Sequence, residues 1–147
     1  MDKENVVDRQ AIGNLLDFYF TAFNRLDSEA VASLFVEDAT LRDLAMGREM
    51  RGRSEIAAFV TEISSLSPDF SLTRRQTLID GSRAAVMHDM AGTHAGEFMG
   101  FPATGRLYHV PVSTYFEFHQ GKISCTTDNW NLLTLLNDLR LTSLVYP

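Results

Sequence analysis

The sequence has few of the features that mark common protein classes: paired cysteines, excess positive charge and long apolar runs. Its one cysteine, Cys125, cannot form an internal disulfide, which excludes a disulfide-stabilised scaffold and favours the cytoplasm. Acidic residues outnumber Lys and Arg by 19 to 13, so a basic face for nucleic acid is not expected. No apolar run approaches the roughly 20 residues that cross a bilayer, and residues 1–5 are charged, unlike a signal peptide. We therefore expect neither nucleic acid nor a membrane as a partner.

Sequence motifs for cofactors and metal ions are missing as well. The chain contains no Walker loop, no G-x-G-x-x-G after a strand and no G-x-S-x-G elbow. None of its four histidines has a companion at the spacing of an established metal motif, and the lone cysteine adds no ligand pair. We therefore expect no cofactor and no metal ion.

What the chain does have is apolar and aromatic content. Apolar residues make up 45% of the 147 residues, enough for a packed core, and the length predicts a single domain over 1–147. Ten Phe, four Tyr and one Trp are more aromatic side chains than a small core needs. Part of that aromatic content could line a pocket for a flat substrate.

The order of predicted elements indicates an α+β fold. The first two fifths of the chain show mainly helical spacing of apolar residues, and the chain after Pro68 shows the alternation of strands. We read the basic stretch Gly47–Arg53 as a loop that leads into the third helix, with Ser54 as its cap. Three N-terminal helices would pack on one face of a curved antiparallel sheet and enclose a pocket. The expected elements are helices over 11–26, 28–35 and 54–63, strands over 38–44, 70–79, 83–98, 107–118 and 122–131, and a short helix through 139.

Two side chains in the first part of the chain are candidates for chemistry. Asp43 shares the face of Ala39 and Leu41 on the predicted strand 38–44, and an inward carboxylate with a raised pKa can act as a general acid or base. The alternative is that the strand ends at Arg42 and Asp43 lies in water. Tyr19 lies on the inner stripe of the first helix and could donate to a carbonyl or enolate oxygen, or it could be a core residue bonded to the backbone.

The last two predicted strands carry polar side chains at positions that could face a pocket. Asp128 shares a face with Thr126 and Trp130, an arrangement that suits a flat oxygenated ligand, although an edge strand in water would have the same pattern. Thr114 is the one polar residue on the apolar face of residues 110–118, where its hydroxyl could orient a ligand or bond to the backbone.

Two stretches resemble the SnoaL-like polyketide cyclases of the NTF2-like superfamily, which also contains ketosteroid isomerase. They are Thr93-His-Ala-Gly-Glu-Phe-Met-Gly-Phe-Pro-Ala-Thr-Gly-Arg106 and Phe116-Glu-Phe-His-Gln-Gly-Lys-Ile123. The resemblance implies a cone-shaped NTF2-like α+β fold with a deep apolar pocket, and a homodimer. It also implies cofactor-independent ring closure by aldol condensation.

The resemblance assigns roles to particular residues. Asp128 matches the acid/base aspartate of the cyclases, while Thr114 and Val112 stand where those enzymes carry a His and a Gln. Compared with ketosteroid isomerase, Asp43 matches the base and Tyr19 the oxyanion donor. The candidate catalytic residues are therefore Asp128, Asp43 and Tyr19. The candidate substrate contacts are Thr114, Val112, Phe116, Trp130 and His94, the last from the first of the two stretches.

The chain keeps the acidic residues of the related enzymes, but the residues beside them differ, so several reactions stay open. We expect an acid/base enzyme that cyclises, isomerises or dehydrates a polyketide-like or other apolar, carbonyl-bearing small molecule. One alternative is an NTF2-like domain that binds a small molecule without catalysis. Another is an epoxide hydrolase in which the paired carboxylates position water.

Overall fold

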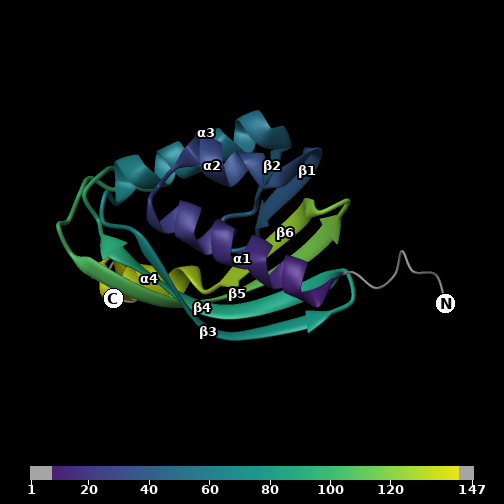
Figure 1. The fold of residues 1–147 in the computed structure, drawn as a ribbon. Helices are drawn as coiled ribbons and strands as arrows, with labels where there is room; N and C mark the ends of the chain where they lie inside the picture. Colours follow the sequence, from purple (N-terminus) through teal and green to yellow (C-terminus); the bar gives the residue numbers. More distant parts are fainter. Residues whose placement is uncertain (1–7, 143–147) are drawn as a thin grey trace.

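A computed structural model describes residues 8–142 of the chain, so the charged residues 1–5 and the C-terminal residues 143–147 lie outside the described part. Helices and a mixed sheet account for most of that range (Figure 1). None of the helices in residues 8–142 is both long enough and apolar enough to cross a membrane. The elements are α1 (Arg9–Asn24), α2 (Ser28–Ser33), β1 (Phe35–Asp43), β2 (Arg48–Arg51), α3 (Gly52–Leu66), β3 (Ser71–Asp80), β4 (Arg83–Thr93), β5 (Leu107–His119), β6 (Lys122–Trp130) and α4 (Leu132–Asp138).

Helix α1 forms where the apolar spacing predicts it. Its N-cap is Asp8, whose carboxylate accepts the backbone N–H of Gln10 at 3.0 Å. The predicted inner stripe is buried and includes Tyr19, and Phe20 beside that stripe is buried too. Phe18, in contrast, points into solvent. The buried arc is therefore wide, because α1 contacts both the sheet and the neighbouring aromatic side chains.

Six strands form one sheet in the order β2-β1-β6-β5-β4-β3. Three of the strand pairs join predicted strands and are antiparallel as predicted, and β1 also pairs antiparallel with β2; β1 and β6, however, run parallel, with Asp43 opposite Asp128. Alternation in a sequence assigns side chains to faces and carries no signal for the relative direction of strands that are distant along the chain. The parallel pairing matters because it brings the C-terminal halves of β1 and β6 to the same end of the sheet.

The three N-terminal helices cover one side of the curved sheet, as the sequence predicts (Figure 1). The core lies between these two layers, where Leu16, Phe35 and Ile56 are fully buried. Strand β5 alternates without a break between buried and exposed positions over its whole length. Its inward side chains, among them Val112 and Thr114, therefore face the helices, while its outward side chains face away from them.

Two local predictions are corrected by the structure. Residues 48–51 form the short edge strand β2 rather than a loop, and α3 begins at Gly52 instead of after Ser54. Apolar alternation is too short to detect in four residues of which three are charged. The strand expected to reach residue 98 ends at Thr93. There the chain turns against the end of α3, so closely that a Cβ on Gly96 would lie 2.4 Å from the carbonyl oxygen of Ser65.

Candidate active site

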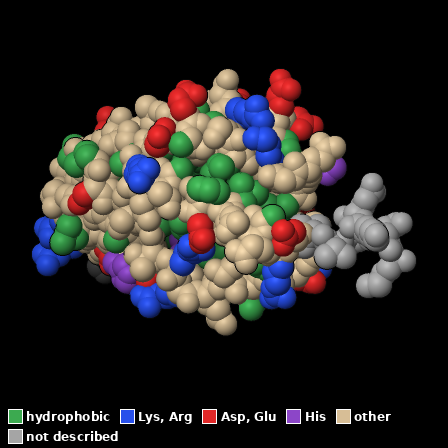
Figure 2. Space-filling model, in the orientation of Figure 1, with side chains coloured by type: hydrophobic (Ala, Val, Ile, Leu, Met, Phe, Trp, Pro, Cys, Tyr) green, Lys and Arg blue, Asp and Glu red, His purple; other side chains and the backbone are tan. Residues whose placement is uncertain are grey.

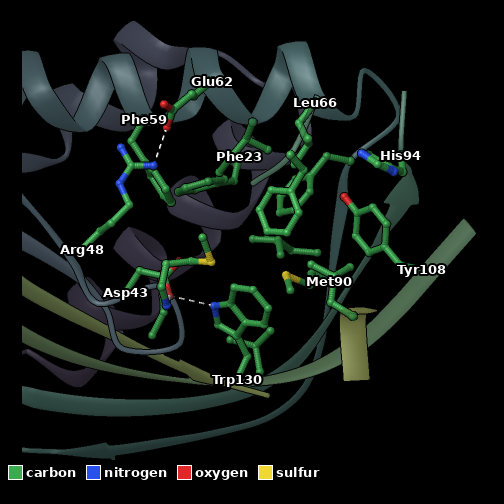
Figure 3. Close-up of a pocket in the computed structure, with 18 of the residues that line it drawn as sticks. Phe23, Asp43, Arg48, Phe59, Glu62, Leu66, Met90, His94, Tyr108 and Trp130 are labelled. Atoms are coloured by element: carbon green, nitrogen blue, oxygen red, sulfur yellow. Dashed lines mark hydrogen bonds and ion pairs between the residues drawn. The ribbon is translucent and has the colours of Figure 1, made fainter. Parts of the chain in front are cut away.

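A cavity of about 320 Å³ lies between the sheet and the helices, within the size range of small-molecule sites (Figure 3). Most of its wall is aromatic, aliphatic or methionine side chain, and two carboxylates from the sheet interrupt that wall. The lining residues are Tyr19, Phe23, Asp43, Met46, Arg48, Phe59, Glu62, Ile63, Leu66, Phe70, Leu72, His88, Met90, His94, Glu97, Phe98, Met99, Tyr108, Val112, Asp128, Trp130, Leu135 and Leu139.

The two carboxylates come from adjacent strands. Asp43 on β1 and Asp128 on β6 are partners in the parallel register, and the backbone N–H of Leu44 donates to the Asp128 carbonyl oxygen at 3.1 Å. Because both residues lie on the inner face, both side chains line the cavity. The inward orientation that the sequence left open for each aspartate is the observed one.

Asp43 is surrounded by hydrogen-bond donors. Its Oδ1 accepts from the indole Nε1 of Trp130 at 3.0 Å and from the backbone N–H of Met46 at 3.2 Å (Figure 3). Burial raises the pKa of the Asp43 carboxyl, while these donors and the charge of Arg48 limit the rise. Trp130 therefore has a second role beside lining the cavity, because it holds Asp43 in place.

Asp128 has much less support for its charge. Its Oδ1 accepts the hydroxyl of Thr114 at 2.6 Å, and this bond favours the ionised form. Burial dominates and raises the pKa of Asp128 to about 7, with a further contribution from the negative charge of Asp43. Near neutral pH this carboxyl is therefore present in both forms and can accept or release a proton.

A histidine that the sequence did not single out completes this arrangement. His88 Nε2 lies 2.8 Å from Thr114 Oγ1, and because the Thr114 hydroxyl donates to Asp128, its oxygen accepts from the Nε2–H of His88. Burial lowers the pKa of His88 to about 4, which keeps the ring neutral at pH 7. A relay of two hydrogen bonds thus runs from His88 on β4 through Thr114 on β5 to Asp128 on β6. The sequence did contain a signal for His88, because this polar residue lies on the inward, otherwise apolar face of residues 84–90.

Tyr19 contributes a hydroxyl from the helix side of the cavity. Its ring is buried edge-to-face against Phe116, with 5.1 Å between ring centroids. Burial and the nearby charge of Asp128 raise the pKa of the Tyr19 phenol well above its ordinary value, so the hydroxyl keeps its proton. Tyr19 lines the cavity, so its protonated hydroxyl can act as a donor to a ligand there.

The five predicted substrate contacts fall into two groups. Val112, Trp130 and His94 line the cavity. Thr114 and Phe116 lie behind its wall instead: the Thr114 hydroxyl is used by Asp128 and His88, and the Phe116 ring stacks on Phe118 with 6.0 Å between centroids.

Charged side chains border the cavity at one end, above Asp43 (Figure 3). Arg48 from β2 forms an ion pair with Glu62 of α3 at 2.7 Å, and its guanidinium carbon lies 5.7 Å from the centre of the Phe59 ring. The sequence did not mark Arg48 as part of a site, because strand β2 was not expected. Among the described residues, no group of three or more His, Cys, Asp or Glu side chains is placed to hold a metal ion.

Comparisons with known proteins agree with this architecture. The family model of the SnoaL-like polyketide cyclases matches residues 13–139. None of the curated proteins matches the chain significantly.

Solved structures share the fold. A candidate polyketide cyclase from Pseudomonas putida is 29% identical, with a TM-score of 0.70 over 84% of this chain and 94% of that chain. A candidate SnoaL-like polyketide cyclase from Jannaschia is 15% identical, with a TM-score of 0.81 over 95% and 97% of the two chains. A protein from Catenulispora acidiphila with a ketosteroid isomerase-like fold, solved with trimethylamine, is 20% identical, with a TM-score of 0.78 over 90% and 97%.

Proposed function

The chain belongs to the SnoaL-like polyketide cyclase family and has the ketosteroid isomerase-like NTF2 fold, and from this premise we propose that it is an acid/base enzyme that needs no cofactor. Its substrate is a small, mainly apolar molecule with an enolisable carbonyl group. The reaction is an aldol-type cyclisation, an isomerisation or a dehydration. The observation that carries this proposal is the carboxyl of Asp128, with a pKa of about 7, facing an apolar cavity beside Asp43.

Proton transfer through Asp128 accounts for the isomerisation and the cyclisation. Thr114 occupies Oδ1 of Asp128, which leaves Oδ2 for the substrate. The ionised carboxylate removes a proton from the carbon next to the carbonyl, and the enolate oxygen accepts a hydrogen bond from Tyr19. In an isomerisation, Asp128 returns the same proton to a different carbon. In an aldol closure, the enolate carbon attacks a second carbonyl carbon, and the new alkoxide takes that proton.

Asp43 supports the same chemistry as a fixed neighbour. Its hydrogen bonds from Trp130 and Met46 hold one oxygen, and its negative charge raises the pKa of Asp128. Burial supplies most of the rise in the pKa of Asp128, and the charge of Asp43 adds to it, so that the carboxyl can exchange protons with carbon near neutral pH. An open cavity that contains both carboxylates favours an enzyme over a domain that only binds a ligand.

Hydrogen–deuterium exchange tests the proposal without knowledge of the natural substrate. The protein is incubated in D₂O with 2-tetralone, a flat bicyclic ketone, and deuterium incorporation next to the carbonyl is followed by NMR. We expect catalysed exchange that Asp128→Asn abolishes. The matched control is Asp38→Asn, which removes an exposed carboxylate from the same strand as Asp43. Exchange that survives in Asp128→Asn would contradict the assigned role.

The epoxide hydrolase alternative uses the same pair of carboxylates differently. There the carboxylates would activate a water molecule, and the product of styrene oxide would be a diol. Formation of the diol without deuterium exchange into 2-tetralone would favour that alternative over the enolate mechanism.

The homodimer predicted from the sequence stays a prediction. The outer face of the sheet would supply the interface, because Met87 on β4 and Tyr115 on β5 are exposed on it. Light scattering on the purified chain measures the oligomeric state, and an exposed charge introduced by Tyr115→Glu would disrupt a dimer formed through this face.

A further inference from the structure

The hydroxyl of Thr114 has one hydrogen and two neighbours that could accept it. Its Oγ1 lies 2.6 Å from Oδ1 of Asp128 and 2.8 Å from Nε2 of His88. The strand register explains both contacts. Thr114 is directly opposite Asp128 on β6, and on β4 its diagonal neighbour is His88, whose direct partner is Val112. Because a hydroxyl donates a single hydrogen bond, this relay can run in either of two directions.

The two directions place the proton of the neutral His88 ring on different nitrogens. In the first direction, Thr114 donates to Asp128 and accepts from Nε2–H of His88, so Nδ1 carries no proton. In the second direction, Asp128 carries a proton on Oδ1 and donates it to Thr114, which in turn donates to an unprotonated Nε2. The ring must then carry its proton on Nδ1. The surroundings of Nδ1 therefore decide between the two directions.

Nδ1 of His88 lies where a proton is unfavourable. The atom is buried and has no hydrogen-bond partner within residues 8–142. The ring of Phe20 meets the imidazole edge-on, with 5.1 Å between ring centroids. A proton on Nδ1 would create a buried N–H group without a partner, which is rare in proteins because nothing replaces the lost water. The first direction is therefore favoured whether Asp128 is ionised or protonated.

The charged and titratable groups around the relay leave the His88 ring neutral. Burial lowers the pKa of His88 to about 4, although the charge of Asp89 opposes this. The titratable neighbours of Asp128 are Asp43 from β1, whose charge raises the pKa of Asp128, and Tyr19 from α1, which keeps its proton. His88 thus stays a neutral donor over the pH range in which Asp128 titrates. The other titratable side chains on the cavity wall are Arg48, Glu62, His94, Glu97 and Tyr108.

We propose that His88 is a positioning residue that fixes the direction of this relay and thereby confines the exchangeable proton of Asp128 to Oδ2. The direction rests on the hydrogen bonds of His88, and the use of that proton at a substrate carbon rests on the proposed function. In that mechanism, Oδ2 takes the proton from the substrate carbon and the same atom returns it. No proton passes through Thr114, whose hydroxyl holds Oδ1.

The tautomer of His88 tests this direction in the unmodified chain. Long-range ¹H–¹⁵N NMR spectra of the labelled protein distinguish a ring protonated at Nε2 from one protonated at Nδ1. His88→Gln assigns the signals, because it removes one of four histidine sets. We expect the Nε2–H tautomer at both pH 5.5 and pH 8.5, on either side of the pKa of Asp128. A ring protonated at Nδ1 at either pH would overturn the proposal.

Two variants measure the action of His88 on Asp128. His88→Met removes the donor, whereas His88→Gln can place an amide N–H near the position of Nε2. NMR titration of the side-chain carboxyl carbon gives the pKa of Asp128. We expect His88→Met to raise this pKa by about half a pH unit, because a Thr114 hydroxyl that accepts no hydrogen bond is a weaker donor to the carboxylate. His88→Gln should keep the pKa close to the wild-type value.

The Thr114→Val background shows whether His88 acts through the hydroxyl. Without that hydroxyl the relay is absent, so adding His88→Met should not move the pKa of Asp128 further. The matched control is His119→Met, which removes an exposed histidine at the end of β5 and should leave the pKa unchanged. No rise in His88→Met, an equal rise in the Thr114→Val background, or an equal rise in His88→Gln would overturn the positioning role.

These outcomes are distinct from those of the proposed function, because neither measurement requires catalysis. Absence of deuterium exchange into 2-tetralone, together with an Nε2–H ring and the expected pKa values, would overturn the proposed function and leave the positioning role in place. Exchange that depends on Asp128, together with a ring protonated at Nδ1, would overturn the positioning role and leave the proposed function in place.

Discussion

Two aspartates on opposite faces of one sheet, the buried Asp89 and the partly buried Asp128, have opposite electrostatic environments. Asp89 on β4 points outward, where it forms an ion pair with Arg75 and lies 3.2 Å from Nε2 of His109. Asp128 on β6 points into the cavity, and its hydrogen-bond partner is the neutral Thr114. The pKa of Asp89 is lowered, chiefly by the hydrogen bond from Arg75, while burial raises the pKa of Asp128 to about 7.

The difference shows that burial alone does not determine whether a carboxylate is charged. A cation within hydrogen-bond distance keeps Asp89 ionised and gives it a structural role. Without a cation, Asp128 retains a proton to near neutral pH, which is the property that an acid/base catalyst needs. Figure 2 shows basic, acidic and histidine side chains interspersed on the visible surface, whereas the cavity wall is mainly apolar. The sheet thus separates an outer surface that carries many charged side chains from a cavity whose wall is mainly apolar.

The largest expected effect is on catalysis. Asp128→Asn should reduce the rate of deuterium exchange into 2-tetralone at pH 7 by about 10²- to 10⁴-fold, the usual contribution of a general acid or base. Asp89→Asn removes the outward carboxylate and should leave the rate of the folded protein within about threefold. If the exchange rate fell equally in the two variants, the cavity-facing and outward carboxylates would not differ in function.

The second effect is on stability, with opposite pH dependence for the two groups. Because the pKa of Asp128 is raised in the folded state, the folded protein binds more protons than the unfolded chain between about pH 4 and pH 7, and stability falls as the pH rises through this window. Asp128→Asn cannot ionise, so above pH 7 it should be more stable than the wild type by roughly 2–4 kcal/mol. Urea unfolding at pH 4.5 and pH 8.5 measures this, and a stabilisation that is the same at both pH values would contradict it.

The third effect concerns Arg75. Arg75→Met should lower Tm at pH 7 by several degrees, because it leaves the buried Asp89 with His109 alone. The lowered pKa of Asp89 gives stability that is present above its ordinary pKa and lost as the pH falls below it, so the two proteins should converge toward pH 3. Arg83→Met, which removes an exposed partner of Asp80, is the matched control and should change Tm less. Thermal scans that separate the variants equally at every pH would rule out this origin.

The smallest expected effect sharpens the role of the relay. Thr114→Val removes the hydrogen bond that favours the ionised form of Asp128, so the inflection in the pH–rate profile should move upward by about one unit. Thr114→Ser keeps the hydroxyl and should leave the inflection in place. Deuterium exchange measured between pH 5 and pH 9 checks this. An inflection that moves to lower pH in Thr114→Val would contradict the conclusion that the Thr114 hydroxyl stabilises the ionised form of Asp128.

Much of the site could be predicted because alternation assigns faces. A polar residue among inward apolar neighbours marked Asp43 as a candidate. The polar face of its strand and the resemblance to the cyclases marked Asp128, and both residues line the cavity. The same reasoning applied to residues 84–90 would have marked His88, which has Val86 and Met90 as its neighbours on that face. Arg48 could not be found this way, because four residues of an edge strand are too few to show a period.

The sequence by itself determined the helices, most of the strands and the family, since these depend on spacing along the chain and on local motifs. Only the tertiary structure decided what lies beside what. The parallel pairing of β1 and β6 places Asp43 next to Asp128, and the approach of β5 supplies Thr114 as the hydrogen-bond donor to Asp128. The electrostatic energy of a carboxyl depends on distances to groups far away in sequence and on the water removed by packing. For that reason the same residue type could become a structural anchor at Asp89 and a candidate catalyst at Asp128.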